Sequence, residues 1–187
     1  MGLVTVSADT QARLLQMLDK QDISECLLRY TRGMDRLDRE LLLSAYHPDA
    51  LDHHGELCRS PIEFWEYYSD WHRQYNLAHH HSISNSTIEL EGDNAHVETY
   101  WQFQAVNVDA STTLHGGRYL DRFEKRQGQW KISARACIME WHGKLGDIVF
   151  DEATEAANSK PGVGRRDRQD RSYQRPLKIP PPASTME

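Results

Sequence analysis

Residues 114–141, LHGGRYLDRFEKRQGQWKISARACIMEW, decide the fold. Apolar and polar residues alternate on both sides of the short turn 126–129, which is the pattern of two strands joined as a hairpin. The same period of two runs through residues 84–91 and 95–106, with turn-forming residues between the runs. Four long strands of this kind predict one strongly curved antiparallel sheet.

The chain ahead of this sheet begins with helical signals. Residues 10–18 are good helix formers with apolar residues three and four apart. Asp22 is a candidate N-cap for a second helix, and Asp38 for a third, which the sequence His-Pro-Asp at 47–49 is expected to end.

A strand pair and a further helix are predicted next. Residues 50–59 are consistent with a short strand pair around Gly55. Ser60 followed by Pro61 is a strong helix start, and that helix is expected to run to Tyr75. The order of the elements predicts an α+β domain in which the sheet wraps around three to four N-terminal helices.

Composition and charge limit the kinds of binding partner and the cellular location that we expect. The chain has 187 residues, 39% hydrophobic and 27% charged, with a formal net charge of −6, which gives no electrostatic case for a nucleic-acid partner. We find no apolar run long enough for a membrane helix and no signal-peptide pattern, so the expected location is cytoplasmic. Three widely spaced cysteines predict neither a disulfide framework nor a zinc site.

The composition changes after Gly146. Residues 160–164 and the Pro-rich run at 179–182 break regular structure, and the basic residues of 165–175 are interleaved with acidic ones. We therefore divide the chain into a domain of residues 1–146 and a C-terminal arm of residues 147–187. This arm is predicted to be disordered or to lie, partly ordered, on a neighbouring subunit.

Asp35 is the first candidate for chemistry. It lies at the edge of the apolar helical stripe that contains Leu27, Thr31 and Met34, so its carboxylate is expected to point toward the interior. Tyr30 flanks the same stripe from the other side. A partly buried carboxylate suits a general base, although Asp35 could equally end its helix and cap the following turn.

The triplet His79-His80-His81 is the second candidate. Strand alternation places His79 and His81 on one side and His80 on the other, and a regular strand would bring Asn85 to the face of His81. A neutral imidazole in an apolar cavity is a good proton acceptor. The alternatives are solvated surface histidines or a metal site shared with residues 52–54, and three adjacent strand histidines cannot all bind one ion.

Arg135 is the third candidate. Alternation groups Arg135 with Cys137 and Met139 on one strand face, which is predicted to be a semi-polar concave surface. There an arginine could bind a leaving anion or orient Asp35, and the alternative is an ion pair on the outer face. Phosphate loops, nucleophile elbows and Cys-x-x-Cys pairs are absent from the sequence.

Taken together, these segments resemble the SnoaL-like branch of the nuclear-transport-factor-2-like superfamily. The resemblance covers about residues 10–145 and rests on YTRGMD at 30–35, HSISN at 81–85, GRYLDRFE at 117–124, and GQWKI at 128–132 with Arg135. It implies a cone-shaped α+β fold that encloses an apolar pocket. The lyases of this family include gamma-hexachlorocyclohexane dehydrochlorinase, scytalone dehydratase and bile-acid 7-alpha-dehydratase, and they need no cofactor.

The resemblance also implies roles for individual residues. His81 matches the base of the family's His–Asp dyad, and Asp35 matches the aspartate that orients it. Tyr30 and Arg135 match groups that assist the leaving group. The expected substrate-binding residues are His80, Asn85, Trp65, Tyr68, Trp101 and His115.

The sequence thus predicts a cofactor-independent lyase, with no metal, that acts on a small hydrophobic cyclic substrate. A ketosteroid-type isomerase, a polyketide cyclase and a non-catalytic binding protein are the alternatives, because a fold does not fix a function. The resemblance implies a homo-oligomer, with a trimer favoured over a dimer.

Overall fold

The computed structural model of the chain describes residues 7–146, 153, 156 and 164–177. Its helices are α1 (Ala8–Asp35), α2 (Arg39–Leu43) and α3 (Pro61–Tyr75), and a 3-10 turn, η1, covers Arg171–Tyr173. Its strands are β1 (Tyr46–His54), β2 (Leu57–Arg59), β3 (Asn76–Glu91), β4 (Asn94–Asn107), β5 (Thr112–Arg126) and β6 (Gln129–Leu145).

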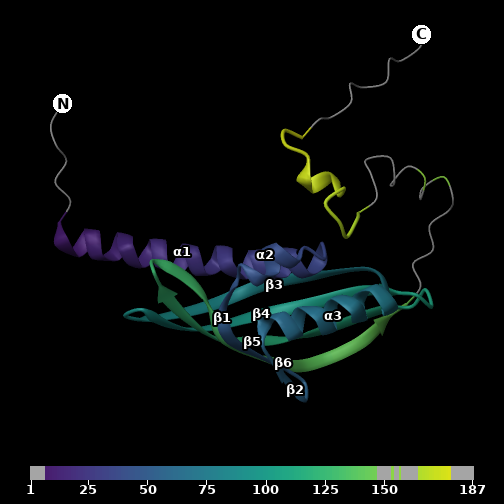
Figure 1. The fold of residues 1–187 in the computed structure, drawn as a ribbon, viewed down its shortest axis with the longest axis horizontal. Coiled ribbons are helices and arrows are strands. Elements are labelled where there is room, and N and C mark those ends of the chain that lie inside the picture. The colour runs from purple at the N-terminus through teal and green to yellow at the C-terminus, as the bar shows by residue number, and fades with distance from the viewer. Residues whose placement is uncertain (1–6, 147–152, 154–155, 157–163, 178–187) are drawn as a thin grey trace, which may run out of the picture.

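The strands form one open, curved sheet in the order β2-β1-β6-β5-β4-β3 (Figure 1). The helices cover its concave side, which confirms the α+β class and the sheet wrapped around a helix layer. The expectation that the whole sheet is antiparallel is wrong for one pair, because β1 and β6 run parallel. The last strand, β6, lies between β5 and β1. It runs antiparallel to β5 and parallel to β1.

The first two predicted helices are one helix. α1 begins after Ser7, whose hydroxyl accepts the Thr10 N–H, and it continues through Asp22 without a break. Asp22 is exposed inside the helix, so solvent satisfies its carboxylate and no cap is needed there. The predicted apolar stripe, which includes Leu27 and Met34, is buried against the sheet.

The next helix is shorter than predicted. Asp38 caps α2 as expected, with its Oδ1 accepting the Leu41 N–H at 3.2 Å, but α2 ends at Leu43. Tyr46 and the residues after it extend β1 instead, since they pair with β6. Gly33 lets α2 approach α1 closely, because a Cβ there would lie 2.5 Å from the Leu42 backbone nitrogen.

α3 and the strand pair before it follow the sequence signals. Ser60 and Glu63 form a reciprocal capping box ahead of Pro61–Tyr75, and β1 pairs with β2 around the turn at Gly55, where φ is +62°.

Part of the predicted arm packs on its own domain. The Tyr173 hydroxyl donates to Asp38 Oδ2 at 2.9 Å, and Arg166 Nη1 donates to the His72 carbonyl oxygen at 2.8 Å. Residues 164–177 therefore lie against the ends of α1, α2 and α3, and the rest of the predicted arm, apart from residues 153 and 156, lies outside the described residues. Within the described part of the chain, no helix combines the length and apolar character needed to cross a bilayer.

Candidate active site

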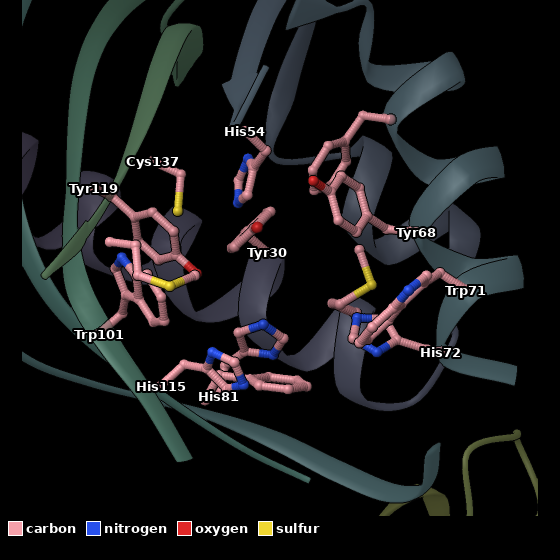
Figure 2. A pocket seen from close by; sticks show the side chains of 15 residues that line it. Tyr30, His54, Tyr68, Trp71, His72, His81, Trp101, His115, Tyr119 and Cys137 are labelled. Atoms are coloured by element: carbon pink, nitrogen blue, oxygen red, sulfur yellow. The ribbon is translucent and has the colours of Figure 1, made fainter. Parts of the chain in front are cut away.

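An apolar cavity of about 390 Å³ lies between the concave face of the sheet and the helices (Figure 2). Its walls are mostly aromatic. Five of the predicted site residues line it: Tyr30, Tyr68, His81, Trp101 and His115. Trp65 is buried in the core of the domain and does not line the cavity.

His81 and Asp35 are in contact at one wall of this cavity. The His81 ring nitrogen Nδ1 lies 2.7 Å from Asp35 Oδ1, and the His81 backbone N–H lies 3.0 Å from each carboxylate oxygen. Their side chains are 9% and 12% exposed. Since the carboxylate accepts from Nδ1, the ring is held with its Nε2 lone pair available to the cavity, which His81 lines and Asp35 does not.

Two further histidines lie beside His81, and one of them, His72, also lines the cavity. The rings of His72 and His79 stack with centroids 4.0 Å apart, and His79 Nε2 donates to the Met34 carbonyl oxygen at 3.2 Å. Burial lowers the pKa of His72 to about 4 and that of His79 to about 2. Both rings are therefore neutral at physiological pH and form an uncharged support for His81.

The other two residues predicted from this strand lie outside the cavity. His80 is exposed on the opposite face of β3, as alternation requires. Asn85 is exposed as well, because the pairing of β3 with β4 shifts by one residue between Ile83 and Ser86. This bulge breaks the alternation from His81 to Asn85. His80 and Asn85, both predicted to bind the substrate, therefore do not line this cavity.

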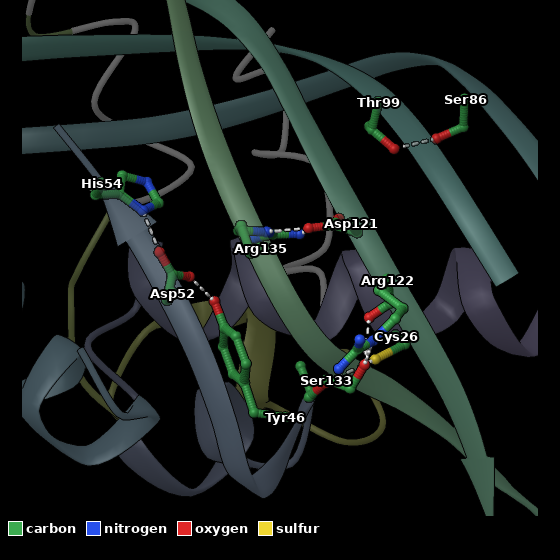
Figure 3. Close-up of polar contacts among 11 residues, drawn as sticks. Cys26, Tyr46, Asp52, His54, Ser86, Thr99, Asp121, Arg122, Ser133 and Arg135 are labelled. Carbon is green, nitrogen blue, oxygen red and sulfur yellow. Dashed lines mark hydrogen bonds and ion pairs between the residues drawn. The ribbon is translucent and has the colours of Figure 1, made fainter. Parts of the chain in front are cut away.

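Arg135 points inward but does not reach the cavity. It donates through Nε and Nη2 to the two oxygens of Asp121, each at 2.7 Å, and both side chains are fully buried (Figure 3). Its guanidinium carbon lies 4.1 Å and 4.0 Å from the ring centroids of Tyr30 and Tyr119. Burial opposes its charge, yet Asp121 raises the pKa of Arg135 well above its ordinary value. The alternative of an outer-face ion pair is wrong, and Arg135 supports two cavity tyrosines from behind.

Sequence reasoning considered His54 and Asp52 only as possible metal ligands. His54 lines the cavity, and its Nδ1 contacts Asp52 Oδ1, while the Tyr46 hydroxyl donates to Asp52 Oδ2 (Figure 3). Alternation along one strand puts Asp52 and His54 on the same face, which is the signal that could have revealed the pair. Among the residues that the structure describes, no cluster of histidine, cysteine and carboxylate side chains is arranged to hold a metal ion.

The fold and the aromatic cavity define the class of protein: an α+β cone that holds a buried polar pair against an apolar pocket. Residues 16–136 match the model of the SnoaL-like domain, and the chain belongs to this family. No significant match occurs among curated proteins.

Solved structures share this fold. A type 2 hexachlorocyclohexane dehydrochlorinase superposes with a TM-score of 0.68 at 19% identity, over 74% of this chain and 96% of that one. The type 3 enzyme from Novosphingobium barchaimii gives 0.66 at 19% identity, over 74% and 97%. A putative scytalone dehydratase from Novosphingobium aromaticivorans gives 0.63 at 17% identity, over 74% and 93%. At these identities the similarity establishes the fold.

Proposed function

We propose that the protein is a cofactor-independent lyase that eliminates water or a hydrogen halide from a hydrophobic cyclic small molecule. The observation that carries the proposal is the contact of His81 with Asp35 at the wall of an apolar, largely aromatic cavity. The fold shared with a dehydrochlorinase and a putative scytalone dehydratase supports the same reaction class.

His81 is the base in this proposal. Its Nε2 accepts a proton from a substrate carbon, and the Asp35 carboxylate stabilises the imidazolium that forms. The apolar walls exclude water and strengthen the electrostatic interaction between the two residues. Asp35 itself does not face the cavity, which favours the histidine over the carboxylate as the group that takes the proton.

Tyr30 assists the reaction from the centre of the cavity. Its ring centroid lies 6.5 Å from that of His81, and burial raises the pKa of its hydroxyl, so the phenol remains a proton donor at neutral pH. Arg135 acts as a positioning residue, since it packs on the rings of Tyr30 and Tyr119 and is shielded from the substrate. The apolar ring of the substrate would rest against Tyr68, Trp101 and His115.

The test is a screen for compounds that the protein converts or binds. Purified protein is incubated with hydroxylated cyclic ketones, including steroids, and with chlorinated cyclohexanes, and the products are identified by mass spectrometry. A product that has lost water or a hydrogen halide supports the lyase. A product of unchanged mass favours the ketosteroid-type isomerase or a cyclase, and a tightly bound but unaltered compound favours a binding protein.

The proposal extends to assembly and location. Exposed apolar side chains gather on the N-terminal half of α1, where Leu15, Met17 and Leu18 are between 56% and 67% exposed. Such a surface supports a homo-oligomer. The preference for a trimer over a dimer rests on the family resemblance alone. Light scattering of the purified protein tests the assembly, and a monomer at micromolar concentration would contradict it.

We expect the protein to act in the cytoplasm, which fractionation of cells that express it would check.

A further inference from the structure

The cavity contains a second histidine–aspartate pair. In Figure 2, His54 and His81 lie at opposite ends of the cavity with Tyr30 between them. Aromatic contacts connect the two ends: the His54 ring centroid is 5.0 Å from that of Phe64, which is 6.2 Å from that of Tyr30. The cavity thus presents one imidazole at each end of an apolar space.

The two pairs are built differently. The Asp52 side chain is fully buried, whereas that of Asp35 is 12% exposed. Both carboxylate oxygens of Asp52 are used, one by the His54 ring and the other by the Tyr46 hydroxyl. A buried carboxylate is stable only when its charge is compensated, so Asp52 strongly favours a protonated His54.

The groups around His54 agree with that charge state. Burial alone would lower the pKa of His54, but the adjacent Asp52 outweighs it and raises the pKa to about 10. Conversely, His54 lowers the pKa of Asp52 against the effect of burial. The ionisable groups that face this pair are Tyr46 from β1, Arg135 and Cys137 from β6, Tyr119 and Asp121 from β5, Tyr68 from α3 and Tyr30 from α1.

We propose that His54 is the oxyanion-binding group of the cavity and that the substrate carries a carbonyl or phenol oxygen at this end. Nδ1 of His54 is held by Asp52, which leaves the Nε2–H on the cavity side, where the Cys137 thiol is its hydrogen-bonding neighbour and a substrate oxygen would take the place of that thiol. Charge-assisted donors in a site without water stabilise a developing oxyanion strongly. Asp52 is the positioning residue, and Tyr46 fixes Asp52.

For turnover this inference rests on the proposed lyase function, and it narrows the substrate class to β-hydroxy or β-halo carbonyl compounds. His81 Nε2 takes the proton from the carbon next to the carbonyl, the C–H electron pair forms a double bond to the carbonyl carbon, and the C=O π pair moves onto oxygen to give an enolate held by His54. The enolate then collapses, a C=C bond forms and the C–X bond breaks. A hydroxide leaving group takes the proton from His81 and departs as water, whereas a halide departs as the anion and His81 returns its proton to solvent. His54 keeps its own proton throughout.

The test uses p-nitrophenol, because its phenolate absorbs visible light and it titrates near neutral pH. In slightly acidic buffer, the wild-type protein is expected to bind it as the phenolate, which is visible as a gain in phenolate absorbance. His54→Gln is expected to weaken binding of the phenolate at least about tenfold. His53→Gln is the matched control, since His53 is the exposed neighbour on the other face of β1, and it should bind as the wild type does.

Two further measurements complete the test. Nitrogen-15 NMR should show the His54 ring protonated well above neutral pH, and Asp52→Asn should bring its titration down toward that of an ordinary histidine. His81→Gln should retain phenolate binding although it strongly lowers turnover, so a failure of the lyase proposal and a failure of the His54 proposal can be told apart. Binding of the neutral phenol by wild type, or equal phenolate binding by His54→Gln and His53→Gln, would overturn the role of His54.

Discussion

Removing the charge of Asp121 tests how the cavity wall is held in place. Arg135 and Asp121 are fully buried and joined by two hydrogen bonds of 2.7 Å. In Asp121→Asn, one of these bonds loses its acceptor and the guanidinium keeps an uncompensated charge. Breaking a buried ion pair by neutralising one partner costs about 3–5 kcal/mol, a large share of the roughly 5–15 kcal/mol that stabilises a typical domain.

Urea denaturation at neutral pH, followed by tryptophan fluorescence and circular dichroism, measures this loss. Asp49→Asn is the matched control, because Asp49 makes a 2.6 Å ion pair with Arg126 while its side chain is 67% exposed. Solvent screening should leave the control close to wild type. If Asp121→Asn lowers the free energy of unfolding no more than Asp49→Asn does, the buried pair does not stabilise the cavity wall.

Three further predictions concern the surroundings of the site. The folded-state pKa values of His72 and His79, about 4 and about 2, lie below the ordinary histidine value, so the unfolded chain binds more protons as the pH falls below about 6.5. The free energy of unfolding should therefore decrease by up to about 1.4 kcal/mol per pH unit for each ring between pH ~6 and pH ~4, measured by urea denaturation. Gly33→Ala should destabilise the protein by roughly 1–3 kcal/mol in thermal unfolding, because its Cβ would meet the Leu42 backbone. Tyr173→Phe removes the 2.9 Å bond to Asp38 and should speed tryptic cleavage within residues 164–177.

Each of these predictions has a control within the chain. His80→Gln removes an exposed histidine and should leave the acid dependence unchanged, whereas a wild-type stability that does not fall on acidification would contradict burial of the two rings. Gly143→Ala adds a Cβ with nothing within 4 Å, and an equal effect of both glycine substitutions would refute the contact of α1 with α2. Tyr67→Phe alters an exposed tyrosine on α3, and tryptic cleavage should remain as slow as in wild type.

Local signals in the sequence predicted much of the fold. Period-two alternation located the four long strands, and the Ser60-Pro61 start located α3, since both depend on neighbouring residues alone. The break expected at Asp22 did not occur: α1 continues through this residue, whose exposed side chain is solvated and caps nothing. The parallel pairing of β1 with β6 depends on contacts far apart in sequence, which no local pattern reports.

The candidate site, like the fold, was only partly predictable from local sequence patterns. Helical phase placed Asp35 only at the edge of the core face, and the family resemblance paired it with His81, whose ring it contacts. The bulge in β3 turned Asn85 outward, and no residue pattern predicted that bulge. On β6, a shift in pairing near Ser133 brings both Ile132 and Arg135 inward, where simple alternation had separated them. The partner of Arg135 on β5 could be recognised only once the strands were paired.

Comparison of His81→Gln, Asp35→Asn and His80→Gln in kcat/KM, on a compound that the wild-type protein is found to process, tests the central claim most directly. The contact of His81 with Asp35 predicts losses of roughly 10²–10⁴-fold in the first two variants, with folding retained. It also predicts near wild-type turnover in the third, whose histidine lies outside the cavity. Full turnover by His81→Gln would contradict the assignment of His81 as the base.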